Sequence, residues 1–93
     1  MKYKVKDHFE MKQIADEYIV IPRGSEALSF NATVVFNETG AFLWNKMAAF
    51  TDAETLAAAL TEQYGIDTAT ALEDTKAFLE KMEKNGMADI AEE

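Results

Sequence analysis

LSFNATVVFNETGAFLW, residues 28–44, contains the change of pattern that decides the fold. In its first half apolar residues alternate with other residues, and this period of two predicts a β-strand that ends at Phe36. These apolar positions are Leu28, Phe30, Ala32, Val34 and Phe36. From Asn37 onward apolar residues fall three and four apart, and asparagine is a preferred N-cap residue. We therefore expect a strand followed directly by a helix over about 38–49.

The residues before this stretch predict two further strands. Residues 9–14 and 18–21 are rich in β-branched and aromatic side chains, and residues 15–17 separate them. Such spacing is typical of a hairpin. Residues 22–25, PRGS, predict a turn before the third strand. The first third of the chain is therefore expected to form a three-stranded antiparallel sheet.

The second half predicts two more helices. Thr51 and Glu54 have the spacing of a capping box, and three apolar residues that share one helical face follow them. These three are Leu56, Leu60 and Tyr64. Gly65 then provides a left-handed end to the helix.

The last helix begins near a cap at Asp67 or Thr68 and reaches Asn85, with Gly86 closing it. Residues 87–90 can return as a short strand. The fold class is thus α+β, a three-stranded antiparallel sheet followed by three helices and a short C-terminal strand, in an order like that of a winged helix-turn-helix. We expect one domain over residues 1–93, with strands at about 9–36 and helices at about 38–85.

Composition narrows the classes of protein. The 93 residues, 48% hydrophobic and 28% charged, suit one packed core. Because cysteine is absent, disulfides and thiolate sites are excluded and a cytoplasmic location is expected. No apolar run approaches the ~20 residues that span a bilayer, so we expect no membrane insertion.

Charge is unevenly distributed along the chain. Residues 1–50 carry six acidic and six basic side chains, whereas residues 51–93 carry eleven acidic and three basic ones. Nucleic acid would be repelled by that half. Two interpretations stay open for it, a solvated acidic surface and a docking face for a basic partner.

The sequence offers little to a catalytic site. His8 is the single histidine. A lone imidazole beside Asp7 and Glu10 cannot build a catalytic triad, and it cannot supply the several ligands that a transition metal needs. Glycine-rich phosphate loops and paired metal-ligand motifs are missing, so we predict no catalytic residue, no metal and no cofactor. The last helix has five acidic side chains, three lysines and no arginine, which disfavours DNA binding.

The sheet is the remaining candidate for a binding site. An edge strand presents unpaired backbone donors and acceptors. If residues 30–36 form such an edge, an extended peptide could add to it as a further strand, with the last helix as a floor for its side chains.

The sequence resembles the PqqD-like proteins, which are peptide-recognition elements of pathways that modify ribosomally made peptides. Residues 36–44, FNETGAFLW, are similar to the family's Asn-x-Thr-Gly-Ala-x-x-Trp pattern. Residues 17–22 correspond to its second strand. Other positions in family order are Phe9, Met11, Ile14, Thr51, Glu54, Leu56, Leu60, Tyr64, Asp74, Phe78, Leu79 and Gly86.

The resemblance implies a non-catalytic module that holds the leader of a precursor peptide and presents it to a modifying enzyme, often a radical S-adenosylmethionine enzyme. The peptide-binding residues that it implies are Ala32, Thr33, Val34, Val35, Phe36, Ala71, Thr75, Phe78, Leu79 and Met82. Since a helix shows one stripe to one place, we expect Leu72, Leu79 and Met82 inside. Ala71, Thr75 and Phe78 are expected nearer the peptide. The 37–44 motif is expected to form a helix start and a core tryptophan.

Two other functions remain open. The same sheet edge could pair two copies, so the protein is expected to be a monomer or a homodimer, and it could be a regulatory subunit of a neighbouring enzyme. A DNA-binding winged helix is the third and least favoured possibility.

Overall fold

The computed structural model describes residues 1–7, 9–22 and 34–92. Several expectations fall on the remainder and so lie outside the described residues. They are the turn at Gly24 and Ser25, the first half of the third strand, and the site residues Ala32 and Thr33.

Three antiparallel strands form the predicted sheet. They are β2 (Phe9–Ile14), β3 (Glu17–Pro22) and β4 (Val34–Phe36), in the order β2-β3-β4. The β2–β3 hairpin is closed by a turn in which Ala15 has a φ of 57°. Inward positions alternate along the strands, so in β4 Val34 and Phe36 are buried while the intervening Val35 is exposed.

Three helices follow, and an Asn or Asp side chain caps each one. They are α1 (Glu38–Lys46), α2 (Ala53–Tyr64) and α3 (Thr68–Lys84). The capping oxygens accept from the backbone N–H three residues on, at 2.8–2.9 Å. The caps are Asn37, Asp52 and Asp67. Thus the predicted caps of α1 and α3 are confirmed.

The predicted cap of α2 is wrong by one residue. Thr51 is not its N-cap, because the backbone of Thr51 pairs with Tyr3 through bonds of 2.7 and 3.0 Å. Asp52, the next residue, caps the helix instead. Similarly α1 ends at Lys46 rather than near residue 49, since the Met47 carbonyl accepts from Val5 N–H at 3.0 Å.

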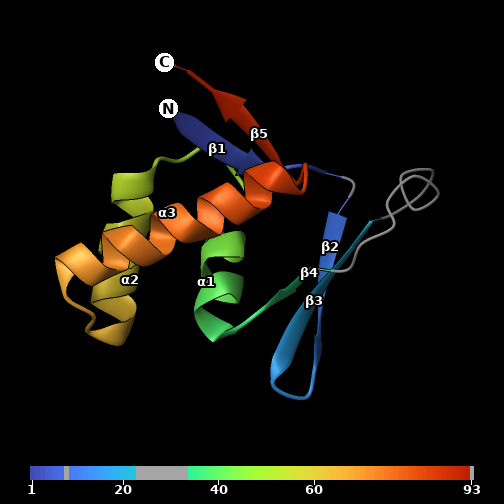
Figure 1. Cartoon of the computed structure of the whole chain (residues 1–93), viewed down its shortest axis with the longest axis horizontal. Coiled ribbons are helices and arrows are strands. Elements are labelled where there is room, and N and C mark those ends of the chain that lie inside the picture. Colours follow the sequence, from blue (N-terminus) through green and yellow to red (C-terminus); the bar gives the residue numbers. More distant parts are fainter. Residues whose placement is uncertain (8, 23–33, 93) are drawn as a thin grey trace.

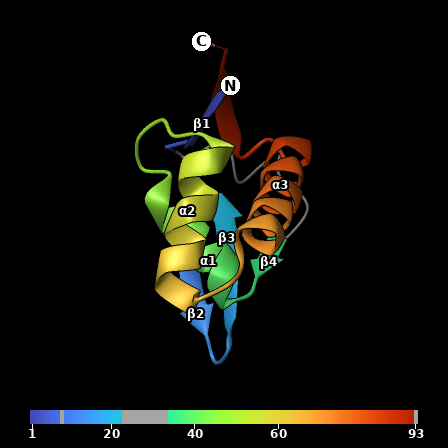
Figure 2. The ribbon, with the colours of Figure 1, turned by 90° about the vertical axis from the view of Figure 1, so that its left-hand side faces the viewer.

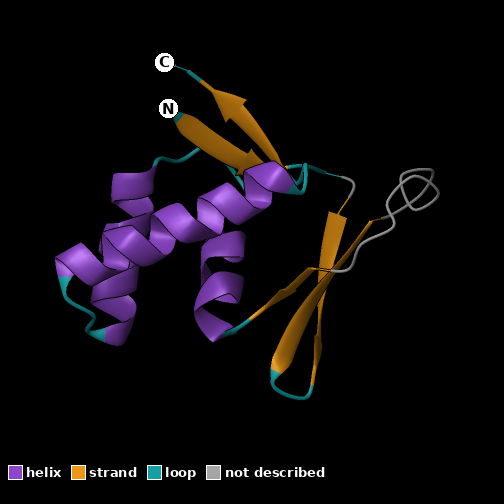
Figure 3. Ribbon diagram, viewed as in Figure 1, coloured by secondary structure: helices purple, strands orange, loops and turns teal. Residues whose placement is uncertain are grey.

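Both of these differences come from an N-terminal strand that was not predicted from the sequence. β1 (Lys2–Val5) pairs antiparallel with β5 (Ala88–Ala91), which confirms the short C-terminal strand. The register joins Lys2 to Ala91 and Val5 to Ala88. Figure 3 shows this two-stranded ribbon and the three-stranded sheet as separate groups of strands around the helices. Figure 1 places both chain ends at the ribbon.

The core lies where the sheet meets the helices. α2 and α3 pack against each other, and in Figure 2 they lie side by side. The largest fully buried side chains are Leu43, Met47, Leu56, Leu60, Met82, Met87, Val20 and Thr75. Asn85 caps the C-terminus of α3, and the next residue, Gly86, has a φ of 67° that permits Met87 N–H to reach the Met82 carbonyl at 2.9 Å.

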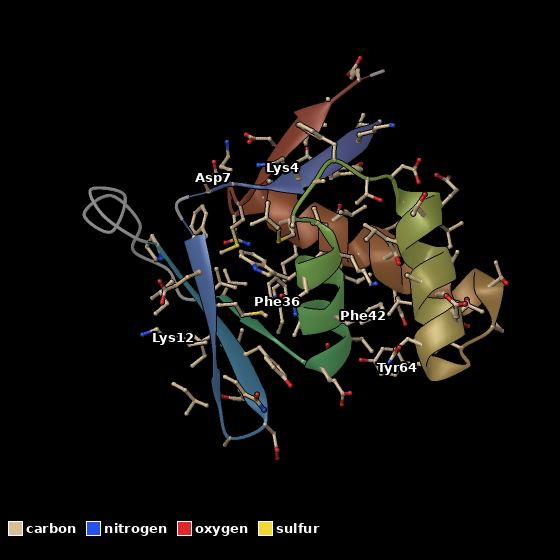
Figure 4. The ribbon with its side chains drawn as sticks, turned by 180° about the vertical axis from the view of Figure 1, so that it is seen from behind. Lys4, Asp7, Lys12, Phe36, Phe42 and Tyr64 are labelled. Carbon is tan, nitrogen blue, oxygen red and sulfur yellow. The ribbon has the colours of Figure 1, made fainter. Side chains whose placement is uncertain are left out.

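Tyr64, the last residue of α2, contacts two residues of α1, Phe42 and Glu38. The Phe42 ring meets the Tyr64 ring edge-on, with the two ring centres 5.5 Å apart. Figure 4 shows the two residues facing each other between α1 and α2. The Tyr64 hydroxyl donates to Glu38 Oε2 at 3.3 Å. Burial, with the Glu38 carboxylate, raises the pKa of Tyr64 above its usual value. At Gly65 the left-handed φ of 69° confirms the predicted end of α2.

These elements confirm the α+β class and the order of strands and helices. The likeness to a winged helix-turn-helix stays a prediction from that order. Across the described ranges, no helix combines the length and apolar character needed to cross a membrane.

Candidate functional site, a groove between β4 and α3

An open groove of about 390 Å³ runs between β4 and α3 and reaches the start of α1. Its walls come from three places in the sequence, the strand–helix junction, α1, and one stripe of α3. The lining residues are Val35, Phe36, Asn37, Thr39, Gly40, Leu43, Asp74, Ala77, Phe78 and Lys81. The four from α3 are spaced three and four apart, so they share one face of that helix.

Aromatic rings form the base of the groove. The Phe36 ring lies 4.9 Å from Phe78 and 6.2 Å from Trp44, both tilted. Figure 4 shows Phe36 in the interior between the sheet and α1. Tilted pairs at this distance are favourable beyond the area they bury, so they hold β4 at a fixed distance from α3.

Gly40 lets the first turn of α1 approach β4 closely. A Cβ atom built at Gly40 would lie 2.8 Å from the Cβ of Phe36 and 3.0 Å from a ring carbon. Carbon atoms prefer separations of about 3.5–4.0 Å, so a side chain here would push the helix away from the strand. The glycine therefore sets the width of the groove at its α1 end.

The backbone of β4 is open toward the groove. Among the described strands β4 pairs with β3 alone. The Val35 carbonyl accepts from Lys81 Nζ at 3.0 Å, so it points at α3 and away from β3. Because the N–H and C=O of one residue in an antiparallel strand point to the same side, the Val35 N–H also faces the groove.

Two opposite charges stand on the α3 wall. The Lys81 ammonium lies 5.0 Å from the centre of the Phe36 ring, within the range of a cation–π contact. Asp74 lies seven residues earlier on the same stripe, about 10 Å away along the helix axis. The groove thus combines an open strand edge, an aromatic base and one charge of each sign.

Comparison with known proteins places the chain in a family. The sequence profile of coenzyme PQQ synthesis protein D (PqqD) matches residues 17–88, from the start of β3 to the first residue of β5. The chain belongs to the PqqD family. This confirms the resemblance found in the sequence. No curated protein matches the chain.

Two solved structures share the fold of this PqqD-family protein. One, described as TbiB1 in complex with the TbiA(beta) leader peptide, has a TM-score of 0.73 at 18% identity and covers 97% of this chain and 99% of that one. The other, described as lasso peptide synthetase B1 complexed with the leader peptide, has a TM-score of 0.72 at 18% identity. It covers 97% of this chain and 100% of that one.

The structure brings only some of the predicted site residues to the groove of the PqqD-family protein. Val35, Phe36 and Phe78 line it. The side chain of Val34, on β4, is buried in the core. The other described members of the predicted set are buried and do not line the groove. They are Ala71, Thr75, Leu79 and Met82.

The expected orientation of α3 is partly wrong. Leu79 and Met82 are inside as predicted, but Leu72 is only partly buried. Ala71 and Thr75, expected nearer the peptide, are 0% exposed. α2 and α3 pack against each other, and small side chains suit the close approach of two helices. Whether these residues support a bound peptide from beneath stays a prediction.

The residues that sequence reasoning missed had recognisable signals. Asn37, Thr39 and Gly40 belong to the quoted 36–44 motif, which was expected to make only a helix start and a core tryptophan. Trp44 is indeed in the core, but the start of the motif also lines the groove. Asp74 lies four residues before Phe78 and Lys81 three residues after it, so all three share one face of α3. The prediction that Phe78 belongs to the site therefore also pointed to Asp74 and Lys81.

Other chemistry is sparse in the described part of the chain. Nowhere there do three or more histidine, cysteine, aspartate or glutamate side chains gather in a way that could hold a metal ion. The cap hydrogen bonds from Thr55 and Thr70 lower the pKa of Asp52 and Asp67, respectively. Both carboxylates serve helix ends away from the groove.

Proposed function

We propose that this protein binds the leader segment of a ribosomally made precursor peptide by adding it as a strand to the open edge of β4. The observation that carries the proposal is the Val35 backbone, which faces a groove with an aromatic base. Membership of the PqqD family supports it, as do the leader-peptide complexes formed by the two proteins of similar fold.

Strand addition would place few constraints on the sequence of the bound peptide. Main-chain hydrogen bonds supply affinity, and alternate side chains of the peptide point down to the aromatic base. Each backbone hydrogen bond contributes about 0.5–1.5 kcal/mol net. After the entropy of ordering the peptide is subtracted, a dissociation constant near the micromolar range is expected.

The proposed role is non-catalytic, and a separate enzyme would modify the bound peptide. In support, the described residues that line the groove include no thiol and no imidazole, and their two ionisable side chains stand on one helix wall. A radical S-adenosylmethionine enzyme is the partner that the family resemblance implies. We place the protein in the cytoplasm with that enzyme.

The same edge could instead pair with a second copy of the chain. Val35 is 38% exposed and Ile21 36% exposed on the sheet surface, so an antiparallel pair of β4 strands would cover apolar area. This alternative predicts self-association that a leader peptide reverses. Sedimentation at several protein concentrations, with and without peptide, tests it.

The deciding experiment compares Val35→Pro with Val35→Thr. Proline removes the N–H that faces the groove but none that pairs with β3, and prolines are tolerated at sheet edges. We expect Val35→Pro to fold and to bind synthetic leader peptides from precursors encoded beside the gene at least tenfold more weakly than wild type. Val35→Thr, which keeps the N–H, should bind them normally.

Amide NMR of the labelled protein gives the location of binding. Saturable shifts at Val35, Phe36, Phe78 and Lys81 are expected on titration. Equal peptide affinity for Val35→Pro and wild type, or shifts confined to the β1–β5 ribbon, would refute strand addition at β4.

A further inference from the structure

Lys81 occupies the place where a peptide strand would bind. Its ammonium donates to the Val35 carbonyl at 3.0 Å and lies 5.0 Å from the centre of the Phe36 ring. The side chain is otherwise exposed. Lysine at an exposed strand edge is a known way to keep other strands from pairing there. In the free protein, Lys81 therefore covers the open edge of β4.

A peptide that adds to β4 needs the carbonyl that Lys81 occupies. The first inward-facing N–H of the peptide must donate to Val35 C=O, so it competes with the ammonium for the same oxygen. Once displaced, the ammonium loses a hydrogen-bond acceptor while the peptide shields it from water. A charged donor in that position binds best to a carboxylate.

Within residues 1–7, 9–22 and 34–92, no carboxylate is paired with Lys81. Among the described ion pairs none includes Lys81. Asp74, the other charged residue of the groove, is two helical turns away. Phe78 lies between them on the stripe. With no described carboxylate paired to Lys81, an acidic side chain of the peptide is the partner that we expect for the displaced ammonium.

We propose that Lys81 is an exchangeable latch that selects peptides with an aspartate or glutamate at one position. The peptide backbone takes the Val35 carbonyl and the acidic side chain takes the Lys81 ammonium. This inference rests on the proposed function, because it names the substrate class of the same groove. Asp74 would disfavour a second acidic residue toward the α1 end, so the selected charge is expected at one end only.

A display library of random twelve-residue peptides, selected against the purified protein, tests the inference without knowledge of the natural ligand. Three proteins are compared, namely wild type, Lys81→Met and Lys76→Met. Methionine keeps an apolar stem over Phe36. Lys76→Met removes the same charge from the same helix at an exposed position outside the groove. We expect wild type and Lys76→Met to enrich an acidic residue at one fixed position, and Lys81→Met to lose that preference.

One enriched peptide is then synthesised with Glu and with Gln at that position. Wild type should bind the Glu form about tenfold more tightly, a difference of about 1.4 kcal/mol. Lys81→Met should bind both forms alike, and the Gln form at least as tightly as wild type does, because the Val35 carbonyl is free.

The outcomes separate this inference from the proposed function. If enriched peptides shift the Val35 and Phe36 amides but show no acidic position, or keep it with Lys81→Met, strand addition survives and the latch is refuted. If no peptide is enriched, or enriched peptides leave those amides unchanged, both proposals fail together.

Discussion

Replacing Gly40 with alanine tests the close approach of α1 to β4. By helix propensity alone the change should stabilise α1, by up to about 1 kcal/mol. However, the new Cβ would lie 2.8 Å from the Cβ of Phe36, an atom that a side-chain rotation cannot move. Relief requires α1 and β4 to separate by about 1 Å, and overpacking of this kind costs about 1–3 kcal/mol.

The net expectation for Gly40→Ala is a loss of up to about 2 kcal/mol, because the cost of overpacking exceeds the gain in helix propensity. In a domain of this size each kcal/mol lost lowers the midpoint of thermal unfolding by about 4–8 °C. Thermal unfolding followed by circular dichroism measures it. Peptide affinity should fall as well, since Gly40 lines the groove.

Asn45→Ala is the matched control for this prediction. Asn45 is exposed in the same helix, and alanine there should raise stability by about 0.5 kcal/mol. A Gly40→Ala protein at least as stable as wild type would refute the steric argument, because propensity would then outweigh the contact with Phe36.

Three further predictions concern stability. Thr75→Val should raise the free energy of unfolding by about 1 kcal/mol, because the buried Thr75 hydroxyl has no partner among the described residues; chemical denaturation measures it, and peptide affinity should not change. Hydrogen bonds from Thr70 lower the pKa of Asp67, so its stabilising effect is present above the usual value of 3.8 and is lost as pH falls through the folded-state pKa. Asp67→Asn should therefore lose less stability than wild type in acid denaturation below about pH 4. Ala15→Gly should stabilise the hairpin by up to about 1 kcal/mol, since Ala15 has a φ of 57°, and an unchanged melting temperature would contradict this.

Structural features that depend on residues close together in the sequence were predicted correctly. Asn37, Gly65 and Gly86 mark helix ends through their own backbone and capping chemistry, which depends on neighbours a few residues away. The alternation before Asn37 likewise predicted a strand that ends at Phe36, which β4 confirms for residues 34–36. These features needed no knowledge of tertiary structure.

Features that depend on distant partners were missed. β1 pairs with residues at the other end of the chain, and its alternating KYKV pattern is too short to identify a strand alone. That same pairing moved the α2 cap from Thr51 to Asp52. On α3, hydrophobicity suggested Leu72 for the core, whereas the smaller Ala71 and Thr75 are the residues that are fully buried. At these positions of α3 the size of the side chain, and not its hydrophobicity alone, determines which residue is buried.

The β1–β5 ribbon also determines how the protein would respond to mechanical force. Lys2 and Ala91, next to the two chain ends, are partners in one antiparallel ladder. A pull that separates the ends loads this pair first and then Tyr3–Ile90, so the ribbon opens one pair at a time and not by shear of all pairs together. Val5–Ala88, the last pair to open, adjoins the bond from Lys6 N–H to the Met87 carbonyl, just beyond the end of α3. Tension between the termini would therefore reach the helix that carries Lys81 only after the whole ribbon has unzipped.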